Sequence, residues 1–239
     1  MVVTPNPEFM LRARKDANFQ ALINESHLSI PDGTGLRFAV AALTDDRLSF
    51  RHTGTDTLVN LAGICEDLGK KLMLLGGDSE SARTAASNLR QQFSQLDVVG
   101  VDPGFIEKDE KGQLVIDPDL ILKINTEKPA VLAVALGMHK QEKFIVGQLY
   151  SLPSVRVAIG VGGAFEMISG SLKRAPDWMR QSGLEWAWRV YLEPKRFNRI
   201  WRASVIFPAY VLYDTVRQGR LLRAVRNVFP EIYNQLRGK

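Results

Sequence analysis

The sequence predicts an α/β fold: a Rossmann-like, mostly parallel sheet with helices on both faces, plus a C-terminal helical appendage. Short apolar runs that end at glycine alternate with helix-like periodic segments through most of the chain. After about Pro176 this alternation stops, and arginines and aromatic residues interleave to the end; all 4 tryptophans lie there. We therefore expect an α/β body over 1–175 and a basic, aromatic-rich helical appendage over 176–239.

Four apolar runs predict the strands of the body, at 71–75, 97–101, 129–136 and 155–161. Most of them lead directly into glycines, as in Gly76-Gly77 and Gly162-Gly163, which is typical of buried parallel strands followed by a tight turn. Ligands of such sheets bind at the carboxyl ends of the strands, so we expect the functional site at these turns.

Periodic apolar positions predict the helices. One helix covers 55–69, with an apolar face that includes Leu58, Cys65 and Leu68, and another covers about 82–93 with Ser79 as its cap. A third runs from beyond Gly137 through Phe144. On this pattern Cys65 belongs to the core and 107–112 forms a polar loop. The sequence leaves open whether the helix over 55–69 lies at a contact between subunits of a homo-oligomer.

Charge is unevenly distributed along the chain. The whole sequence has 31 Lys+Arg against 26 Asp+Glu, a net charge of +5, but the segment from Lys173 onward holds 14 basic and 5 acidic residues. A basic tail on an acidic body favours an anionic partner: a phosphate-rich ligand, nucleic acid or anionic lipid.

The cysteine and histidine content argues against some functional classes. A single cysteine excludes a disulfide framework, and three distant histidines give no zinc site. No apolar run reaches the ~18 residues of a membrane span. The N-terminus does not resemble a signal peptide, so we expect a cytoplasmic protein.

Several local motifs allow both a structural and a functional interpretation. The Pro-Asp-Gly sequence around Asp32 suits a plain turn or a rigid catalytic carboxylate, and the polar sequence from Thr4 to Glu8 suits a helix cap. The segment that starts at His139 is either a solvated helix start or a helix N-terminus facing a phosphate or sugar. The glycines from Gly160 lack the spacing of a dinucleotide fingerprint, which favours a close packing turn. The Asp-x-Asp motif at Asp117 is better explained as a helix start than as a metal site.

Two sets of arginines stand out in the appendage. Arg189, Arg196 and Arg199 would share one side of a continuous helix, although Pro194 is expected to kink or end it. Such a group suits a diphosphate, with a solvated basic face as the alternative. The second set steps by three residues among apolar side chains and predicts a separable basic amphipathic helix for an anionic membrane surface; it comprises Arg217, Arg220, Arg223 and Arg226.

Taken together, a series of motifs in this order resembles the WecG/TagA/CpsF family of bacterial glycosyltransferases, over roughly residues 4–202. The motifs are Thr4-Pro5-Asn6-Pro7-Glu8, Pro31-Asp32-Gly33-Thr34-Gly35, Arg51-His52-Thr53-Gly54-Thr55-Asp56, Leu75-Gly76-Gly77, Lys140-Gln141-Glu142, Gly160-Val161-Gly162-Gly163-Ala164-Phe165, Arg174-Ala175-Pro176, Glu185-Trp186-Ala187-Trp188-Arg189 and Glu193-Pro194-Lys195-Arg196-Phe197-Asn198-Arg199.

The resemblance implies an inverting, metal-independent enzyme without a cofactor. It would transfer N-acetylmannosamine, or a related sugar, from a UDP donor to an amino sugar on undecaprenyl (polyprenyl) diphosphate, at the inner face of the plasma membrane. Its product would enter teichoic acid or cell-surface polysaccharide synthesis. The appendage would close the active site and associate with the membrane.

The resemblance also implies roles for individual residues. Asp32 matches the general base, and Thr4 and Asn6 match residues beside it. Arg51 and Gln141 match other substrate-binding positions. The three arginines Arg189, Arg196 and Arg199 match appendage residues that close over the donor diphosphate.

The chain departs from the family pattern at His139, where proline is usual, and at Glu166, where aspartate is usual; either change can shift sugar preference. Thr4 also lies nearly at the start, which a misplaced gene start, a fragment or a tolerated loss of an edge element would explain. The alternatives are an inactive, N-terminally truncated member and a non-catalytic nucleotide or nucleic-acid binding protein. Nucleic acid is disfavoured because the aromatic residues fall at helix spacing rather than free to stack. An oxidoreductase is disfavoured because no early G-x-G-x-x-G occurs.

Overall fold

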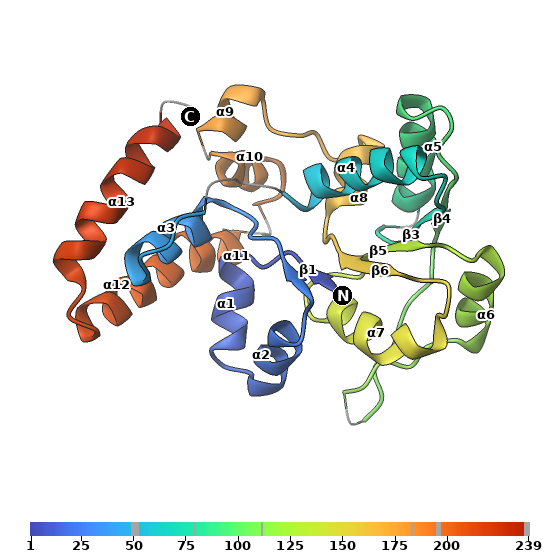
Figure 1. Cartoon of the computed structure of the whole chain (residues 1–239), viewed down its shortest axis with the longest axis horizontal. Helices are drawn as coiled ribbons and strands as arrows, with labels where there is room; N and C mark the ends of the chain where they lie inside the picture. Colours follow the sequence, from blue (N-terminus) through green and yellow to red (C-terminus); the bar gives the residue numbers. More distant parts are fainter. Residues whose placement is uncertain (49–52, 79, 111, 183, 195–196, 237–239) are drawn as a thin grey trace. The chain divides into compact units, whose positions relative to one another are not determined.

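The computed structural model describes residues 1–48, 53–78, 80–110, 112–182, 184–194 and 197–236 (Figure 1). The chain forms two compact units. The first comprises Met1–Thr4, Asn18–Ile30 and Thr53–Lys173, and the second comprises Pro5–Ala17, Pro31–His52 and Arg174–Lys239.

The first unit contains one parallel sheet of six strands. These are β1 (Val2–Val3), β2 (Leu28–Ser29), β3 (Leu72–Gly76), β4 (Val98–Val101), β5 (Val131–Ala135) and β6 (Val157–Gly160). Their order across the sheet is β2-β1-β6-β5-β3-β4, and every neighbouring pair is parallel. The α/β class and the four predicted strands are confirmed as β3 to β6. The two-residue strands β1 and β2 are too short to give a pattern in the sequence.

Helices cover both faces of this sheet, as predicted. Side chains of β3 alternate between two cores: Leu72 and Leu74 face one, and Met73 and Leu75 face the other. The first core is closed by α4 (Gly54–Asp67), α5 (Ser81–Gln92) and α8 (Ala164–Ser169), and the second by α6 (Pro118–Glu127) and α7 (Lys140–Gln148) (Figure 1). The unit also contains most of α2 (Ala17–Asn24) and the short helix η1 (Leu149–Ser151).

The predicted helix over 55–69 corresponds to α4, and its apolar face is buried only in part. Leu58 and Cys65 lie in the core, and burial raises the pKa of the Cys65 thiol, as expected for a packing cysteine. Leu68, by contrast, is exposed because the helix ends at Asp67. The predicted cap Ser79 lies outside the described residues, and Glu80 occupies the N-cap position of α5.

The second unit is helical. Its helices are α1 (Pro7–Ala13), α3 (Thr34–Leu43), α9 (Asp177–Gln181), α10 (Glu185–Leu192), α11 (Phe197–Trp201), the π-helical turn η3 (Arg202–Ile206), α12 (Phe207–Arg217) and α13 (Leu221–Leu236). A small apolar core joins three of them, with Leu11 from α1, Leu36 and Ala39 from α3, and Phe207 from α12.

This core explains why each unit is built from several segments of the chain. The sequence predicts instead a single boundary after residue 175. The segments Pro5–Ala17 and Pro31–His52 belong to the second unit because α1 and α3 bury their apolar faces against α12. Both α12 and α13 pack against α3. The C-terminal helices are therefore not a separable tail: removing them would expose the face of α3.

Candidate active site

In the first unit, Thr4 and Gln141 meet at the end of strand β6. The Thr4 hydroxyl donates a hydrogen bond to the Gly160 carbonyl at 2.9 Å. The Gln141 side-chain oxygen accepts a hydrogen bond from the Gly162 N–H at 3.2 Å, and Gln141 is only 2% exposed. A Cβ at Gly160 would lie 2.5 Å from Gln141 Nε2, which confirms the prediction of a close packing turn.

Glu142 forms hydrogen bonds with two groups next to this cluster. Its carboxylate accepts one hydrogen bond from Gln141 Nε2 at 2.7 Å and another from the His139 backbone N–H at 2.5 Å. Burial raises the pKa of Glu142, although these hydrogen bonds act in the opposite direction. His139 has a φ of 76°, a strained value for a residue other than glycine, and the bond to Glu142 secures it. The solvated helix start considered for this segment is wrong at Gln141 and Glu142, which are buried.

In the second unit, the turn that carries Asp32 is tied to the residue before Asn6. The Asp32 backbone N–H donates to the Pro5 carbonyl at 2.7 Å. Asn6 is the N-cap of α1, and its side-chain oxygen accepts from the N–H groups of Glu8 and Phe9. The cap interpretation is thus confirmed, and Asp32 and Asn6 lie in one bonded group of the second unit.

Glu8 extends this group to Arg199. Arg199 donates through Nε at 3.0 Å and through Nη2 at 2.6 Å to the two carboxylate oxygens of Glu8. The hydrogen bonds to Glu8 raise the pKa of Arg199, so its guanidinium stays charged. The Glu8 carboxylate thus binds the guanidinium through two oxygens, as a phosphate group can. From the sequence alone, Glu8 is expected only as part of a helix cap.

Two of the appendage arginines, Arg189 and Arg199, lie on separate helices. Arg189 lies on α10, with its guanidinium 3.9 Å from Glu193. That helix ends at Leu192, and Arg199 follows on the separate helix α11, so the continuous helix needed for a shared arginine side does not form. Arg51 and Arg196 lie outside the described residues.

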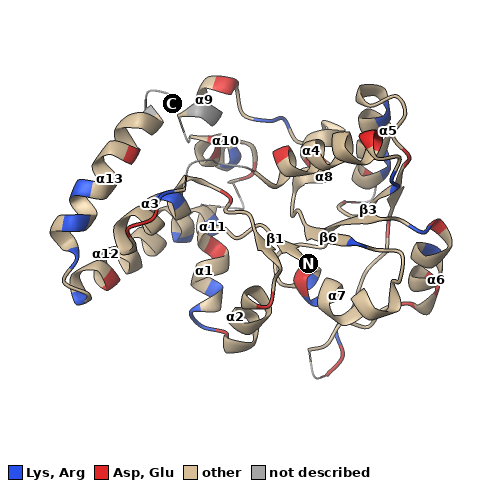
Figure 2. Ribbon diagram, viewed as in Figure 1, with Lys and Arg blue, Asp and Glu red and all other residues tan. Residues whose placement is uncertain are grey.

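The C-terminal arginines do not form one basic helix. Arg217 ends α12, Gly219 adopts a φ of 64°, and α13 begins only at Leu221. Arg220 and Arg223 approach Asp45, at 2.8 and 3.6 Å. The predicted continuous helix with four arginines on a lipid face is therefore wrong, because a left-handed glycine ends α12. Figure 2 shows the basic residues in blue along α13.

The Asp-x-Asp motif is a helix start, as predicted. The Asp117 carboxylate caps α6 by accepting from the Asp119 N–H at 2.9 Å.

Comparison with known proteins identifies the family. Residues 1–221 match the glycosyl transferase WecG/TagA/CpsF family, and the chain belongs to this family. A relative from Bacillus subtilis (strain 168) is 32% identical over 213 residues, which cover 89% of this chain and 77% of the relative. Relatives from Bacillus spizizenii and Staphylococcus aureus (strain MRSA252) are each 29% identical, over 88% and 83% of this chain and 76% and 74% of their own. All three are named N-acetylglucosaminyldiphosphoundecaprenol N-acetyl-beta-D-mannosaminyltransferase.

The protein is therefore a glycosyltransferase, as the motifs predicted. In the described part of the chain, no helix is both long and apolar enough to cross a bilayer.

We expect the stability cost of Glu142→Gln to depend on pH. Glutamine cannot accept both hydrogen bonds, so the variant should be less stable by about 1–3 kcal/mol. The raised pKa also means that the free energy of unfolding of the parent falls as pH rises from about 4.3, the ordinary value for glutamate, through the raised pKa. The glutamine variant lacks this fall.

Urea unfolding of both proteins at about pH 4 and about pH 7 measures this difference. The cost of the substitution should be larger at the lower pH. A cost that stays constant or grows with pH would contradict burial as the main cause of the raised pKa.

Proposed function

We propose that this protein transfers N-acetylmannosamine from a UDP donor to N-acetylglucosamine carried on a polyprenyl diphosphate, with inversion and without a metal ion. The names of the relatives from Bacillus and Staphylococcus support the transferred sugar and the acceptor. The product is consumed in teichoic acid or cell-surface polysaccharide synthesis.

The observation that carries the proposal is the anchored turn at Asp32. Its backbone is bonded to Pro5, and α3 starts two residues later at Thr34, so the carboxylate stands on a fixed turn. In the reaction the acceptor hydroxyl attacks the anomeric carbon of the donor sugar and loses its proton to Asp32. The bond between that carbon and the UDP oxygen breaks at the same time, and inversion results.

Arginines stabilise the negative charge that develops on the departing UDP. Arg199 is held by Glu8 in a two-point pair, which presents its planar guanidinium in a fixed orientation. We propose that the diphosphate takes over one or both of these hydrogen bonds, with Arg189 as the second cation. Positive side chains then do the work that a metal ion does in other transferases. The Asp-x-Asp motif at Asp117, a form that metal-dependent sugar transferases use, is a helix start in this chain.

The outer face of α13 is proposed to contact an anionic membrane that carries the lipid-linked acceptor. Leu222, Val225 and Phe229 recur at helical spacing and are exposed, Leu222 at 88% and Phe229 at 71%. Ala224 and Glu231 lie on the opposite, buried side. An apolar stripe beside arginines on a helix suits reversible attachment at a lipid surface.

Asp32→Asn should lower turnover roughly 10²–10⁴-fold, the usual contribution of general-base catalysis, and leave UDP binding unchanged. The assay follows UDP release from UDP-N-acetylmannosamine in the presence of a soluble N-acetylglucosamine diphosphate acceptor. Asp119→Asn is the matched control and should keep full activity. Near-normal turnover of the Asp32 variant would remove it as the base, and activity that is lost in EDTA and restored by manganese would refute metal independence.

Arg199→Ala should lower turnover on the same soluble acceptor by about 10²–10³-fold, because stabilisation of the leaving group is lost. Arg199→Lys should recover little of it, since lysine keeps the charge but not the two-point geometry. Arg83→Ala, at an exposed arginine of the first unit, is the control. Normal turnover together with a lower melting temperature would mean that Arg199 serves only to pair with Glu8.

Replacing Leu222 and Phe229 with serine should release the protein from anionic vesicles while its activity on soluble acceptor stays unchanged. Both side chains are exposed, so the fold loses little when they are replaced. Vesicle co-sedimentation measures binding, with Ile64→Ser on α4 as an exposed apolar control. Undiminished vesicle binding by the double variant would disprove this contact.

A further inference from the structure

We propose that Glu231 on α13 is a positioning residue for Asp32, which it controls by holding α3 at two points. The inference rests on the proposed function, in which Asp32 is the base. It concerns a contact within the second unit that joins α13 to the segment following Asp32.

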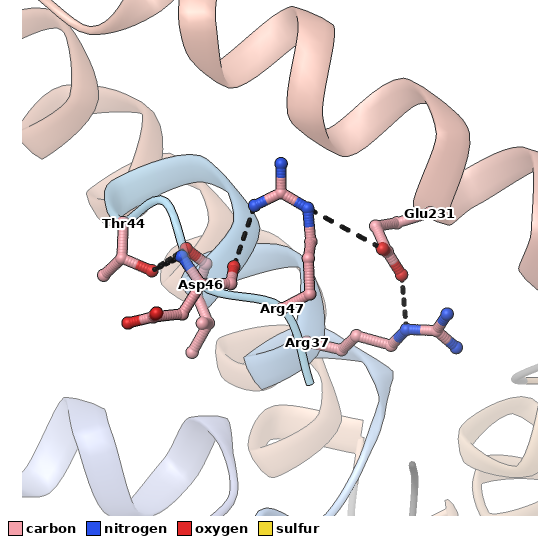
Figure 3. Close-up of polar contacts among 6 residues, drawn as sticks. Arg37, Thr44, Asp46, Arg47 and Glu231 are labelled. Atoms are coloured by element: carbon pink, nitrogen blue, oxygen red, sulfur yellow. Dashed lines mark hydrogen bonds and ion pairs between the residues drawn. The ribbon is translucent and has the colours of Figure 1, made fainter. Parts of the chain in front are cut away.

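Glu231 faces two arginines, Arg37 within α3 and Arg47 in the segment after the helix ends at Leu43. Its Oε2 atom accepts a hydrogen bond from Arg37 Nε at 2.5 Å, and its Oε1 atom lies 3.9 Å from Arg47 Nε (Figure 3). The side chains of Glu231 and Arg37 are only 12% and 17% exposed. Water therefore screens this pair weakly, and removal of Glu231 deprives Arg37 of this carboxylate in a largely buried place.

The two arginines belong to one continuous, internally bonded segment. Arg37 lies in the first turns of α3. Beyond its end, the Thr44 hydroxyl donates to the Val40 carbonyl and accepts from the Asp46 N–H, and Arg47 donates to the Asp46 carbonyl (Figure 3). Glu231 thus contacts both the helix and the turn that closes it, so it resists rotation of α3 as well as displacement.

The first turn of α3 has no side-chain cap and is held by packing instead. Gly33, directly after Asp32, has a φ of 89° and no side chain to cap the helix, and a Cβ there would meet nothing within 4 Å. Gly33 therefore joins Asp32 to the helix without a side chain that would fix their relative orientation. Two residues further on, Gly35 fits tightly against Pro7, where an added Cβ would lie 2.8 Å from the ring. A shift of α3 would therefore disturb the contact with Pro7 and the neighbouring hydrogen bond from Asp32 to Pro5.

The first experiment measures turnover of Glu231→Ala and Glu231→Gln with the soluble acceptor, UDP binding and vesicle binding. Displacement of a catalytic group by a distant change costs up to about 100-fold, so we expect a loss of about 10- to 100-fold for alanine. Glutamine should lose less, because it still accepts from Arg37. UDP affinity and vesicle binding should stay unchanged, and Glu127→Gln, which breaks an ion pair with Lys71 in the first unit, should leave turnover unchanged.

The second experiment combines these changes with Asp32→Asn. If Glu231 acts through Asp32, the double variant should turn over no more slowly than Asp32→Asn alone, because the group that Glu231 positions is already gone. The exchanged pair, Arg37→Glu with Glu231→Arg, should recover part of the turnover lost in Arg37→Glu alone. This exchange and Glu231→Gln still decide the matter if Glu231→Ala does not fold.

The outcomes separate the two hypotheses. If Asp32→Asn keeps normal turnover, the proposed function fails, whatever Glu231 does. If Asp32→Asn loses turnover but Glu231→Gln and Glu231→Ala retain it, or if the losses multiply in the double variant, Glu231 does not act through Asp32. Loss of vesicle binding with full turnover would place Glu231 in membrane attachment instead and overturn the inference.

Discussion

The hydrogen bond from the Asp32 N–H to the Pro5 carbonyl is the constraint on which the candidate site of the second unit depends. It joins two loops that are distant in sequence, one entering α1 and the other entering α3. Asn6 then caps α1, and the first turn of that helix presents Glu8 to Arg199. The Asn6 cap is local, whereas Glu8 and Arg199 lie 191 positions apart in the sequence. The acceptor is the carbonyl of Pro5, and the fixed φ of this proline stiffens the loop.

Three glutamates each bind hydrogen-bond donors at or near the candidate residues. Glu142 orients Gln141 and the strained backbone of His139, Glu8 holds Arg199, and Glu231 holds Arg37 beside the Asp32 turn. A carboxylate suits this work because it offers two oxygens and several lone pairs, so it can bind two donors at once. The same feature makes its replacement costly where the site is buried, since the donors then lack a partner.

The two sides of helix α13 differ in burial and composition. Its inner side contains a small residue, Ala224, and the carboxylate Glu231, and its outer side contains exposed apolar residues. Because these sides are separated by helical periodicity, substitutions on one need not disturb the other. The arginines before and at the start of the helix, Arg220 and Arg223, approach the exposed carboxylate of Asp45, which partly offsets the positive charge at this end.

The sequence by itself determined four of the six strands, the family and several of the helices. Buried strands such as β3 and β5 are continuous apolar runs that end at glycine, and helix starts such as Asp117 have a local capping chemistry, so short segments contain the whole signal. The motif around Asp32 was sufficient to predict a turn. Only the tertiary structure decided which segments belong to which unit, that Gln141 is buried against Glu142, and that Glu8 and Glu231 are the partners of Arg199 and Arg37. These pairings join residues up to 194 positions apart, and no local pattern specifies them, because any exposed glutamate could in principle meet any arginine until the helices are packed.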